Sequence, residues 1–117
     1  MRHHKKRRTL NRPKAQRVAL LKSLARSLVL KNGITTTAAK AKELRPFVES
    51  LVTESKKNTV ASRRVVTSRL GSAEAVQKLH DEYAKRFAAR AGGYTRIVRL
   101  GRVGKRVAEM ARIEFLA

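Results

Sequence analysis

The side chains of this chain that are able to do catalytic or metal chemistry are few. There are three histidines and eight carboxylates, and there is no cysteine. His3 and His4 are adjacent, but the first acidic residue is Glu43, and a metal or general-base site needs further groups held on a rigid scaffold. We expect this pair to lie near phosphate instead. His80 precedes two acidic residues in an expected helix, and without a positioned nucleophile it is predicted to be a surface histidine.

Other catalytic signatures are also missing from the sequence. Without cysteine there is no disulfide framework, no thiolate metal site and no thiol nucleophile. Gly92-Gly93 is a weak turn signal and lacks the Lys-Ser or Lys-Thr ending of a phosphate-binding loop. The sequence therefore predicts no enzyme, no metal site, no cofactor and no small-molecule substrate.

The strongest chemical feature is positive charge. The 29 lysines and arginines outnumber the 8 acidic residues, which gives a net charge of +21, and thirteen of these cations precede Glu43. Self-repulsion on this scale disfavours a compact chain unless a polyanion neutralises it. The sequence therefore predicts a polyanionic partner, contacted most strongly by the N-terminal third.

The aromatic content helps to choose among polyanions. Proteins that bind single strands stack bases on exposed aromatic rings, yet Tyr83, Phe87 and Phe115 belong to apolar stripes, and only Tyr94 is doubtful. No helix pair has the spacing of a helix-turn-helix. These features favour a folded RNA recognised through its backbone and shape. A DNA-compacting protein and a basic membrane-surface protein are the alternatives.

The sequence shows no segment that would cross a membrane, and we expect no membrane partner. No apolar run approaches the roughly eighteen residues of a membrane span, and the start lacks the apolar segment of a secretory signal. An organelle-targeting peptide is a weaker alternative, because serine is absent before Ser23. We expect a cytoplasmic protein.

The chain divides into a tail and one domain. Residues 1–12 have no periodicity that could bury a face, so we expect a basic RNA-binding extension that is disordered when the protein is free. Residues 13–31 are predicted to form a helix, because Leu21, Leu24, Ala25 and Leu28 make one apolar stripe. Its opposite face is typical of a solvated surface and carries Lys14, Arg17, Lys22 and Arg26.

Capping residues divide the middle of the domain. Residues 34–37 predict a short strand, and Thr37 is suited to cap a helix over 38–56 that we expect to kink, not break, at Pro46. Asn58 or Thr59 begins the next helix, and Gly71 ends it. Ser72 then caps a fourth helix, whose apolar stripe is Val76, Leu79, Tyr83 and Phe87.

The C-terminal part predicts a hairpin. Residues 94–100 and 108–116 are rich in strand-forming residues, and the loop 101–107 between them is flexible and basic. Residues 34–36 are suited to add an edge strand. The expected fold is α+β, with several helices packed on a small, mostly antiparallel sheet, in a single domain over residues 13–117.

Several segments together carry a family resemblance. They are Met1-Arg2-His3, Leu10-Asn11-Arg12, Ser27-Leu28, Ile34-Thr35-Thr36-Thr37, Lys40-Ala41-Lys42-Glu43-Leu44, Arg63-Arg64 and Arg90-Ala91-Gly92-Gly93-Tyr94-Thr95-Arg96-Ile97. In this order and spacing, the chain resembles the family of large-subunit ribosomal protein seventeen of bacteria over nearly its whole length. One departure is Gly104-Lys105, where the family usually has Gly-Asp.

The resemblance implies a non-catalytic structural constituent of the large ribosomal subunit. It implies an α+β domain whose basic extension is embedded in large-subunit ribosomal RNA, near the polypeptide-exit side and among neighbouring ribosomal proteins. The RNA contacts that it implies are Arg2, His3, Lys5, Lys6, Arg7, Arg8, Asn11, Arg12, Lys14, Arg17, Lys40, Lys42, Arg63, Arg64, Arg90 and Arg96. The basic loop adds Arg102, Lys105 and Arg106 as candidate contacts.

Overall fold

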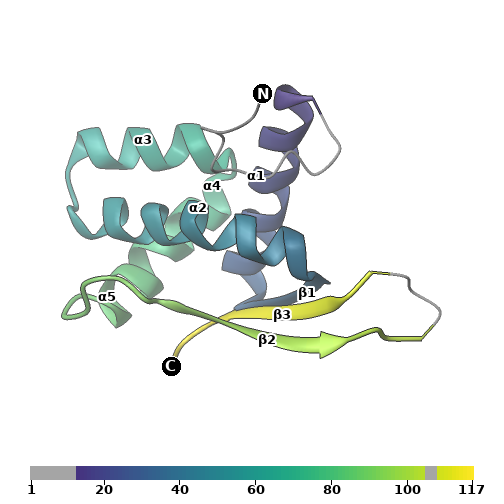
Figure 1. Cartoon of the computed structure of the whole chain (residues 1–117). Helices are drawn as coiled ribbons and strands as arrows, with labels where there is room; N and C mark the ends of the chain where they lie inside the picture. Colours follow the sequence, from purple (N-terminus) through teal and green to yellow (C-terminus); the bar gives the residue numbers. More distant parts are fainter. Residues whose placement is uncertain (1–12, 105–107) are drawn as a thin grey trace, which may run out of the picture.

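A computed structural model describes residues 13–104 and 108–117 (Figure 1). The predicted tail and part of the predicted basic loop lie outside these described residues. The elements are α1 (Lys14–Lys31), β1 (Gly33–Thr37), α2 (Ala38–Lys56), α3 (Val60–Leu70), α4 (Ala73–Lys78), the π-helical segment η1 (Leu79–Tyr83), α5 (Ala84–Arg86), β2 (Thr95–Gly101) and β3 (Met110–Phe115). The predicted α+β class is confirmed.

The helix starts follow the predicted caps. The Thr37 hydroxyl accepts a hydrogen bond from the backbone N–H of the third residue along, at 3.3 Å, and begins α2. Thr59, and not Asn58, caps α3 in the same way at 3.0 Å, and Ser72 caps α4 at 3.4 Å. Each hydroxyl satisfies a backbone donor that the first helical turn leaves unpaired.

The helix ends also follow from residue type. Gly71 has a φ of 73° and terminates α3, as predicted. Asn32, with a φ of 64°, terminates α1, because asparagine tolerates the left-handed region better than most residues. α2 runs unbroken through Pro46, as expected, while the kink at that position stays a prediction.

The fourth predicted helix is one helical stretch in space, but it is divided into α4, η1 and α5. The wider π-helical turn over Leu79–Tyr83 was not predicted. His80 lies in this turn and is buried, so the prediction of a surface histidine was wrong. The reason lies in the spacing, since residue 80 is four after Val76 and three before Tyr83 and therefore shares their buried stripe.

The sheet has the order β1-β3-β2, and both strand pairs are antiparallel. The predicted hairpin of β2 and β3 is confirmed, with Ile97 opposite Ile113 and an irregularity between Arg99 and Gly101. The predicted edge strand is also confirmed, because β1 pairs with the other side of β3. β3 is therefore the central strand.

The helices cover one face of this sheet. In Figure 1, α2 lies between the sheet and α3, so α3 is separated from the sheet by a whole helix. The core between these layers is mostly aliphatic, with aromatic rings at one end, where Tyr83 stacks on Phe115 with ring centroids 4.1 Å apart. Tyr94, whose position the sequence left in doubt, is 1% exposed and packs against Phe87. None of these rings is available to stack on a nucleic-acid base.

Candidate nucleic-acid interface

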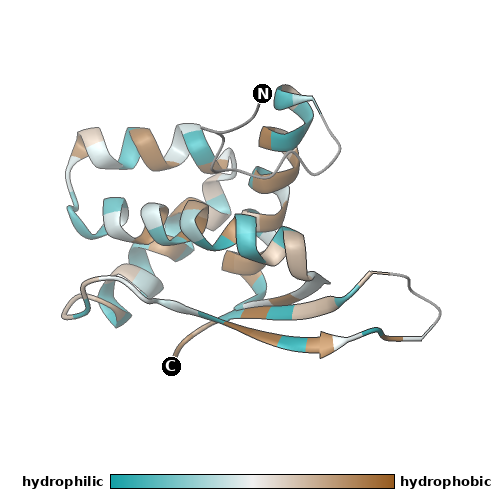
Figure 2. Ribbon diagram, in the orientation of Figure 1, coloured by the Kyte–Doolittle hydropathy of each residue, from teal (hydrophilic) through white to brown (hydrophobic). Residues whose placement is uncertain are grey.

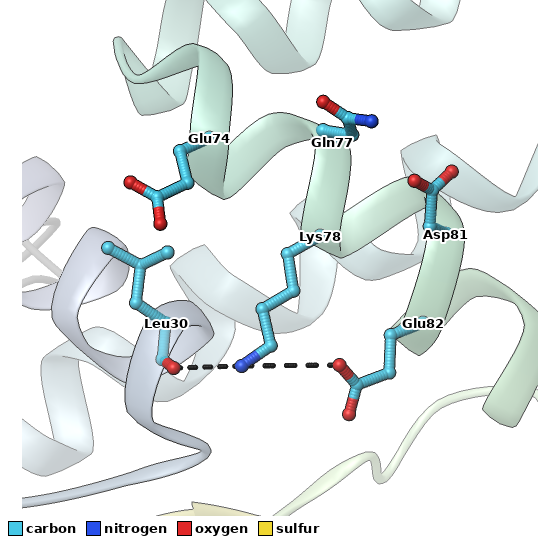
Figure 3. Close-up of a pocket in the computed structure, with 6 residues that line it drawn as sticks. All are labelled: Leu30, Glu74, Gln77, Lys78, Asp81 and Glu82. Atoms are coloured by element: carbon cyan, nitrogen blue, oxygen red, sulfur yellow. Dashed lines mark hydrogen bonds and ion pairs between the residues drawn. The ribbon is translucent and has the colours of Figure 1, made fainter.

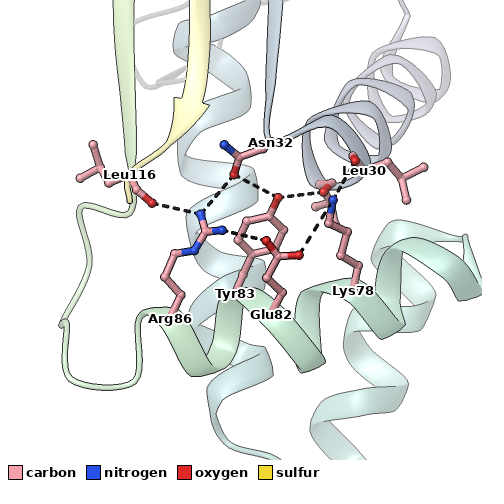
Figure 4. Close-up of polar contacts among 8 residues, drawn as sticks. Leu30, Asn32, Lys78, Glu82, Tyr83, Arg86 and Leu116 are labelled. Carbon is pink, nitrogen blue, oxygen red and sulfur yellow. Dashed lines mark hydrogen bonds and ion pairs between the residues drawn. The ribbon is translucent and has the colours of Figure 1, made fainter.

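Some cations of this protein are used to hold its own fold together (Figure 4). The Arg86 guanidinium donates to the Asn32 side chain and to the Leu116 carbonyl, both at 3.1 Å, and to the Glu82 carboxylate at 2.7 Å. The buried Tyr83 hydroxyl donates to the Val29 carbonyl at 2.9 Å, and burial raises the pKa of this phenol to about 12. This network joins the end of α1 to the end of β3.

Lysines make similar contacts to backbone carbonyls. Lys78 donates to the Leu30 carbonyl at 2.8 Å, in the last turn of α1, where a helix leaves its carbonyls unpaired. Lys56 donates to the Arg90 carbonyl and, at 3.1 Å, to the Tyr94 hydroxyl. Lys22, which sequence analysis assigned to a solvated face, donates to a carbonyl of α3 at 3.2 Å. These ammonium groups stabilise the domain before any partner binds.

The sheet arginines form a second group, because each lies beside a carboxylate. Arg96 and Arg112 flank Glu114, at 3.2 and 3.6 Å respectively. Arg99 lies 3.7 Å from Glu109. Such exposed pairs contribute little stability, but they place negative charge next to every arginine of the sheet.

Arg45 and Lys57 pair with Glu49 and Glu54 on α2, and the cations that then remain are a third group. Within the part of the chain that the structure describes, their side chains make no hydrogen bond or ion pair with protein. They are Lys14, Arg17, Arg26, Lys31, Lys40, Lys42, Arg63, Arg64, Arg69, Lys85, Arg90 and Arg102. We call these twelve the unpartnered cations.

The predicted RNA contacts distribute clearly over these groups. Eight of them are unpartnered cations, namely Lys14, Arg17, Lys40, Lys42, Arg63, Arg64, Arg90 and Arg102. Only Arg96 belongs to the paired group. The other ten lie outside the described residues, and they are Arg2, His3, Lys5, Lys6, Arg7, Arg8, Asn11, Arg12, Lys105 and Arg106.

The structure does not gather these side chains on one surface. α1 and α3 hold four of the eight, the start of α2 holds two, and the last two lie in the loop after α5 and after β2. Figure 1 shows α3 and the hairpin on opposite sides of α2. Sequence reasoning missed four unpartnered cations, Arg26, Lys31, Arg69 and Lys85. These four cations lie outside the buried stripes of their helices, and this pattern in the sequence could have identified them.

One unpartnered cation acts on the interior of the domain. His80 is buried, and neither of its ring nitrogens has a hydrogen-bond partner among the described residues. Burial, followed by the positive charge of Arg63, lowers the His80 pKa, while the backbone of Ser55 and the Asp81 carboxylate act in the opposite direction. Burial and the charge of Arg63 therefore favour the neutral imidazole.

Three of the eight acidic side chains lie at a different place, in an open hollow between α1 and α4–η1 (Figure 3). Leu30, Glu74, Gln77, Lys78, Asp81 and Glu82 line it. In Figure 3 the Lys78 ammonium group lies between the Leu30 carbonyl and the Glu82 carboxylate. The carboxylates of Glu74 and Asp81 lie away from this lysine. Over residues 13–104 and 108–117, no three histidine or acidic side chains are placed to hold a metal ion. The hollow repels phosphate and contains no nucleophile paired with a base.

Membrane insertion finds no support in the helices that the structure describes, since none of them combines the length and apolar character of a bilayer span.

Comparison with known proteins gives a consistent answer. The family model described as ribosomal protein L17 matches residues 20–116. A protein named large ribosomal subunit protein bL17 from Gemmatimonas aurantiaca is 49% identical over 116 residues, which cover 99% of this chain and 98% of the relative. A protein of the same name from Hydrogenobaculum sp. is 51% identical over 117 residues, covering 99% of both chains.

Proposed function

Because this chain belongs to the ribosomal protein L17 family, we propose that it is a structural, non-catalytic constituent of the large ribosomal subunit in the cytoplasm. There it binds folded large-subunit ribosomal RNA through phosphate contacts and stabilises that fold, which supports translation. The observation that carries the RNA-binding part is the set of twelve unpartnered cations, while the other cations of the described residues already have partners within the protein.

The spread of these cations favours an RNA that surrounds the domain. A duplex lying on one face would be met by one continuous basic surface, whereas here cations occur on α3, at the start of α2 and in the hairpin loop after β2. Folded RNA presents phosphates from several helices and directions. Arginine suits such contacts, because its planar guanidinium matches two phosphate oxygens at once.

We propose the following contacts within this function. The primary RNA contacts of the domain are the eight unpartnered cations named from the sequence, and Arg26, Lys31, Arg69 and Lys85 join them. The ten predicted contacts that lie outside the described part complete the set, and they are Arg2, His3, Lys5, Lys6, Arg7, Arg8, Asn11, Arg12, Lys105 and Arg106. Arg96 is a weaker candidate, because Glu114 already lies 3.2 Å away.

We also propose a position near the polypeptide-exit side of the subunit, among neighbouring ribosomal proteins. This rests on the family resemblance, in which the basic extension is embedded in RNA beside other proteins. Chemical cross-linking of purified subunits with mass spectrometry tests it. Cross-links from this chain to proteins that surround the exit opening are expected, and cross-links confined to the opposite side would contradict it.

Sedimentation tests the main proposal. The tagged full-length chain, expressed in bacteria, is expected to migrate with the large subunit in a sucrose gradient at high magnesium and to remain there after a salt wash. Migration at the top of the gradient would contradict the proposal. The runner-up function, DNA compaction, predicts comparable binding to duplex DNA and ribosomal RNA, so competition between the two at one salt concentration separates these functions.

A further inference from the structure

The described residues contain one concentration of exposed apolar side chains, and it lies on β2 and just beyond it. Val98, Leu100 and Val103 are 41%, 43% and 48% exposed. They are three of the five large apolar side chains that are exposed in the described part of the chain. Figure 2 shows the corresponding brown bands along β2 among teal ones. Exposed apolar groups that cluster on one element mark a contact surface more often than scattered ones do.

This strand is also an edge of the sheet. In the order β1-β3-β2, β2 pairs with β3 on one side, and within residues 13–104 and 108–117 no strand pairs with its other side. Arg45 donates to the carbonyl of Thr95 at 3.4 Å and Glu49 accepts from the backbone N–H of Thr95 at 3.2 Å, and these two contacts occupy only the beginning of that side. An exposed edge offers a row of backbone donors and acceptors to another extended chain.

The register shows which side chains such a chain would meet. Thr95 and Ile97 lie opposite the buried Phe115 and Ile113, so they face the helices. Val98 lies opposite Arg112, on the face that no helix covers. Arg96, opposite Glu114, shares this uncovered face with Val98, whereas Arg99, opposite the buried Ala111, lies on the face of Thr95 and Ile97. An added strand would therefore meet an apolar and a charged side chain on the uncovered face.

The charges of this edge differ from those of the helices. Arg96 and Arg99 each lie within 4 Å of a carboxylate, so a phosphate group placed there would meet Glu114 or Glu109 as well. The arginines are nevertheless more exposed than these partners, with side-chain exposures of 57% against 22% and 63% against 45%. The edge is thus mildly positive toward solvent, and its exposed apolar side chains Val98 and Leu100 suit a protein segment with carboxylates better than a phosphate backbone.

A second copy of this chain is a poor occupant of the same edge. Antiparallel pairing of β2 with β2 would bring Arg96 and Arg99 of both copies, four cations, into one strand pair, where like charges are destabilising when they lie close together. The favoured occupant is therefore a different protein with acidic side chains.

From these observations we propose that the free edge of β2 binds an extended segment of a neighbouring protein as a fourth strand. Apolar side chains of that segment pack on Val98 and Leu100, and its carboxylates face Arg96, on the same face of the sheet as Val98, and Arg99, on the other face. The inference rests on the proposed function, because the assembled large subunit supplies the neighbour.

Photo-cross-linking in the assembled subunit tests the inference. A diazirine amino acid, which inserts into protein and RNA alike, replaces Val98 in the full-length chain, and subunits are purified and irradiated. The expected product survives ribonuclease, is removed by protease, and contains a peptide of another protein with apolar and acidic residues. A ribonuclease-sensitive product, a cross-link between two copies of this chain, or no product in subunits that contain the chain would overturn the inference.

Two controls make the result specific. The same amino acid at Val60, an exposed valine on α3, is expected not to give the same protein product. Introducing Val98→Glu while the probe is at Leu100 is expected to lower the yield of the cross-linked product about tenfold, because the apolar contact of Val98 with the partner is lost. The melting temperature of the free protein is expected to stay unchanged, because the Val98 side chain is exposed there. An unchanged yield would contradict the docking site. Absence of the chain from the subunit would instead contradict the proposed function.

Discussion

α3 and the sheet each carry three arginines, and the two regions use them differently. In α3 these are Arg63, Arg64 and Arg69, and no acidic residue occurs in Val60–Leu70. The three arginines of the sheet all lie beside Glu109 or Glu114. The same residue type is therefore an unpartnered cation in one region and half of an ion pair in the other. Composition and net charge cannot separate these cases, whereas the position of the carboxylates can.

The topology explains part of the difference. β3 is the central strand, so Glu114 has an arginine across the strand pair and another two positions along its own strand. α3 lies on the far side of α2 from the sheet, and its exposed face meets no other described element. The comparison predicts that the α3 side contacts phosphate and that the sheet edge contacts protein.

The largest expected effect comes from a stretch that carries cations without any acidic residue, as α3 does. Deleting residues 1–12 removes Arg2, Lys5, Lys6, Arg7, Arg8 and Arg12. Each neutralised phosphate releases condensed counterions, so we expect the log-log salt dependence of ribosomal RNA binding to flatten by up to roughly 4 to 5 units. The melting temperature of residues 13–117 is expected to change little, because the deleted segment has no apolar stripe.

Two measurements on the truncated and full-length chains check this expectation. Binding to large-subunit RNA is measured at several salt concentrations, and thermal unfolding is followed by circular dichroism. An unchanged salt slope would show that the extension is not the electrostatic anchor. A collapsed melting transition would show that it belongs to the fold.

A matched pair of double variants tests the comparison itself. Arg63→Ala with Arg64→Ala is expected to lower the salt slope of RNA binding by about 1.4 units, at about 0.7 per phosphate contact. Arg96→Ala with Arg99→Ala removes the same charge and is expected to change the slope by less than half as much, because both residues have carboxylate neighbours. Equal changes in slope would show that the ion pairs do not distinguish the two regions.

A smaller effect is expected at the shared carboxylate of the sheet. Glu114→Gln removes the partner of both Arg96 and Arg112, yet we expect the free energy of unfolding to fall by less than about 1 kcal/mol, since exposed ion pairs contribute little. Urea unfolding with the Glu54→Gln variant, which loses the exposed pair with Lys57, provides the matched control. A loss of several kcal/mol would show that Glu114 organises the sheet.

Much of the fold could be predicted from local signals. Thr37, Ser72 and Gly71 mark helix boundaries because caps and left-handed ends depend on one residue and its near neighbours. The pairing of Arg96 with Glu114 could not be predicted, because it requires the register of two strands eighteen residues apart. The π-helical turn likewise depends on packing, not on local preference. The candidate site was predictable where cations lie on exposed helix positions, and less so where a distant carboxylate changes their role.

The last prediction concerns the effect of the positive charge of Arg63, on α3, on the buried His80. His80 is buried, and burial together with Arg63 holds its pKa below the ordinary 6.5. The unfolded chain therefore binds a proton more readily than the folded one as the pH falls below about 6.5, and protonation favours unfolding. The stability associated with neutral His80 is fully present above that pH and is lost progressively below it. The Asp81 carboxylate and the backbone of Ser55 reduce this loss without reversing it.

Replacing Arg63 tests whether its positive charge changes the pKa of the buried His80. In Arg63→Ala, the pKa of His80, followed by its ring proton shifts in NMR, is expected to move upward toward its ordinary value, and the loss of melting temperature between pH 7.5 and about 5.5 is expected to shrink. The His80→Gln variant should lack this part of the pH dependence, which separates it from that of other groups. Arg112→Ala is the matched control, because Arg112 already lies beside Glu114 and does not act on His80. Phosphate bound at Arg63 would neutralise the same charge, so bound RNA is expected to raise the His80 pKa in the same direction as the substitution. If the His80 pKa is identical in the parent and Arg63→Ala proteins, the charge of Arg63 has no effect on His80, and burial alone keeps the imidazole neutral.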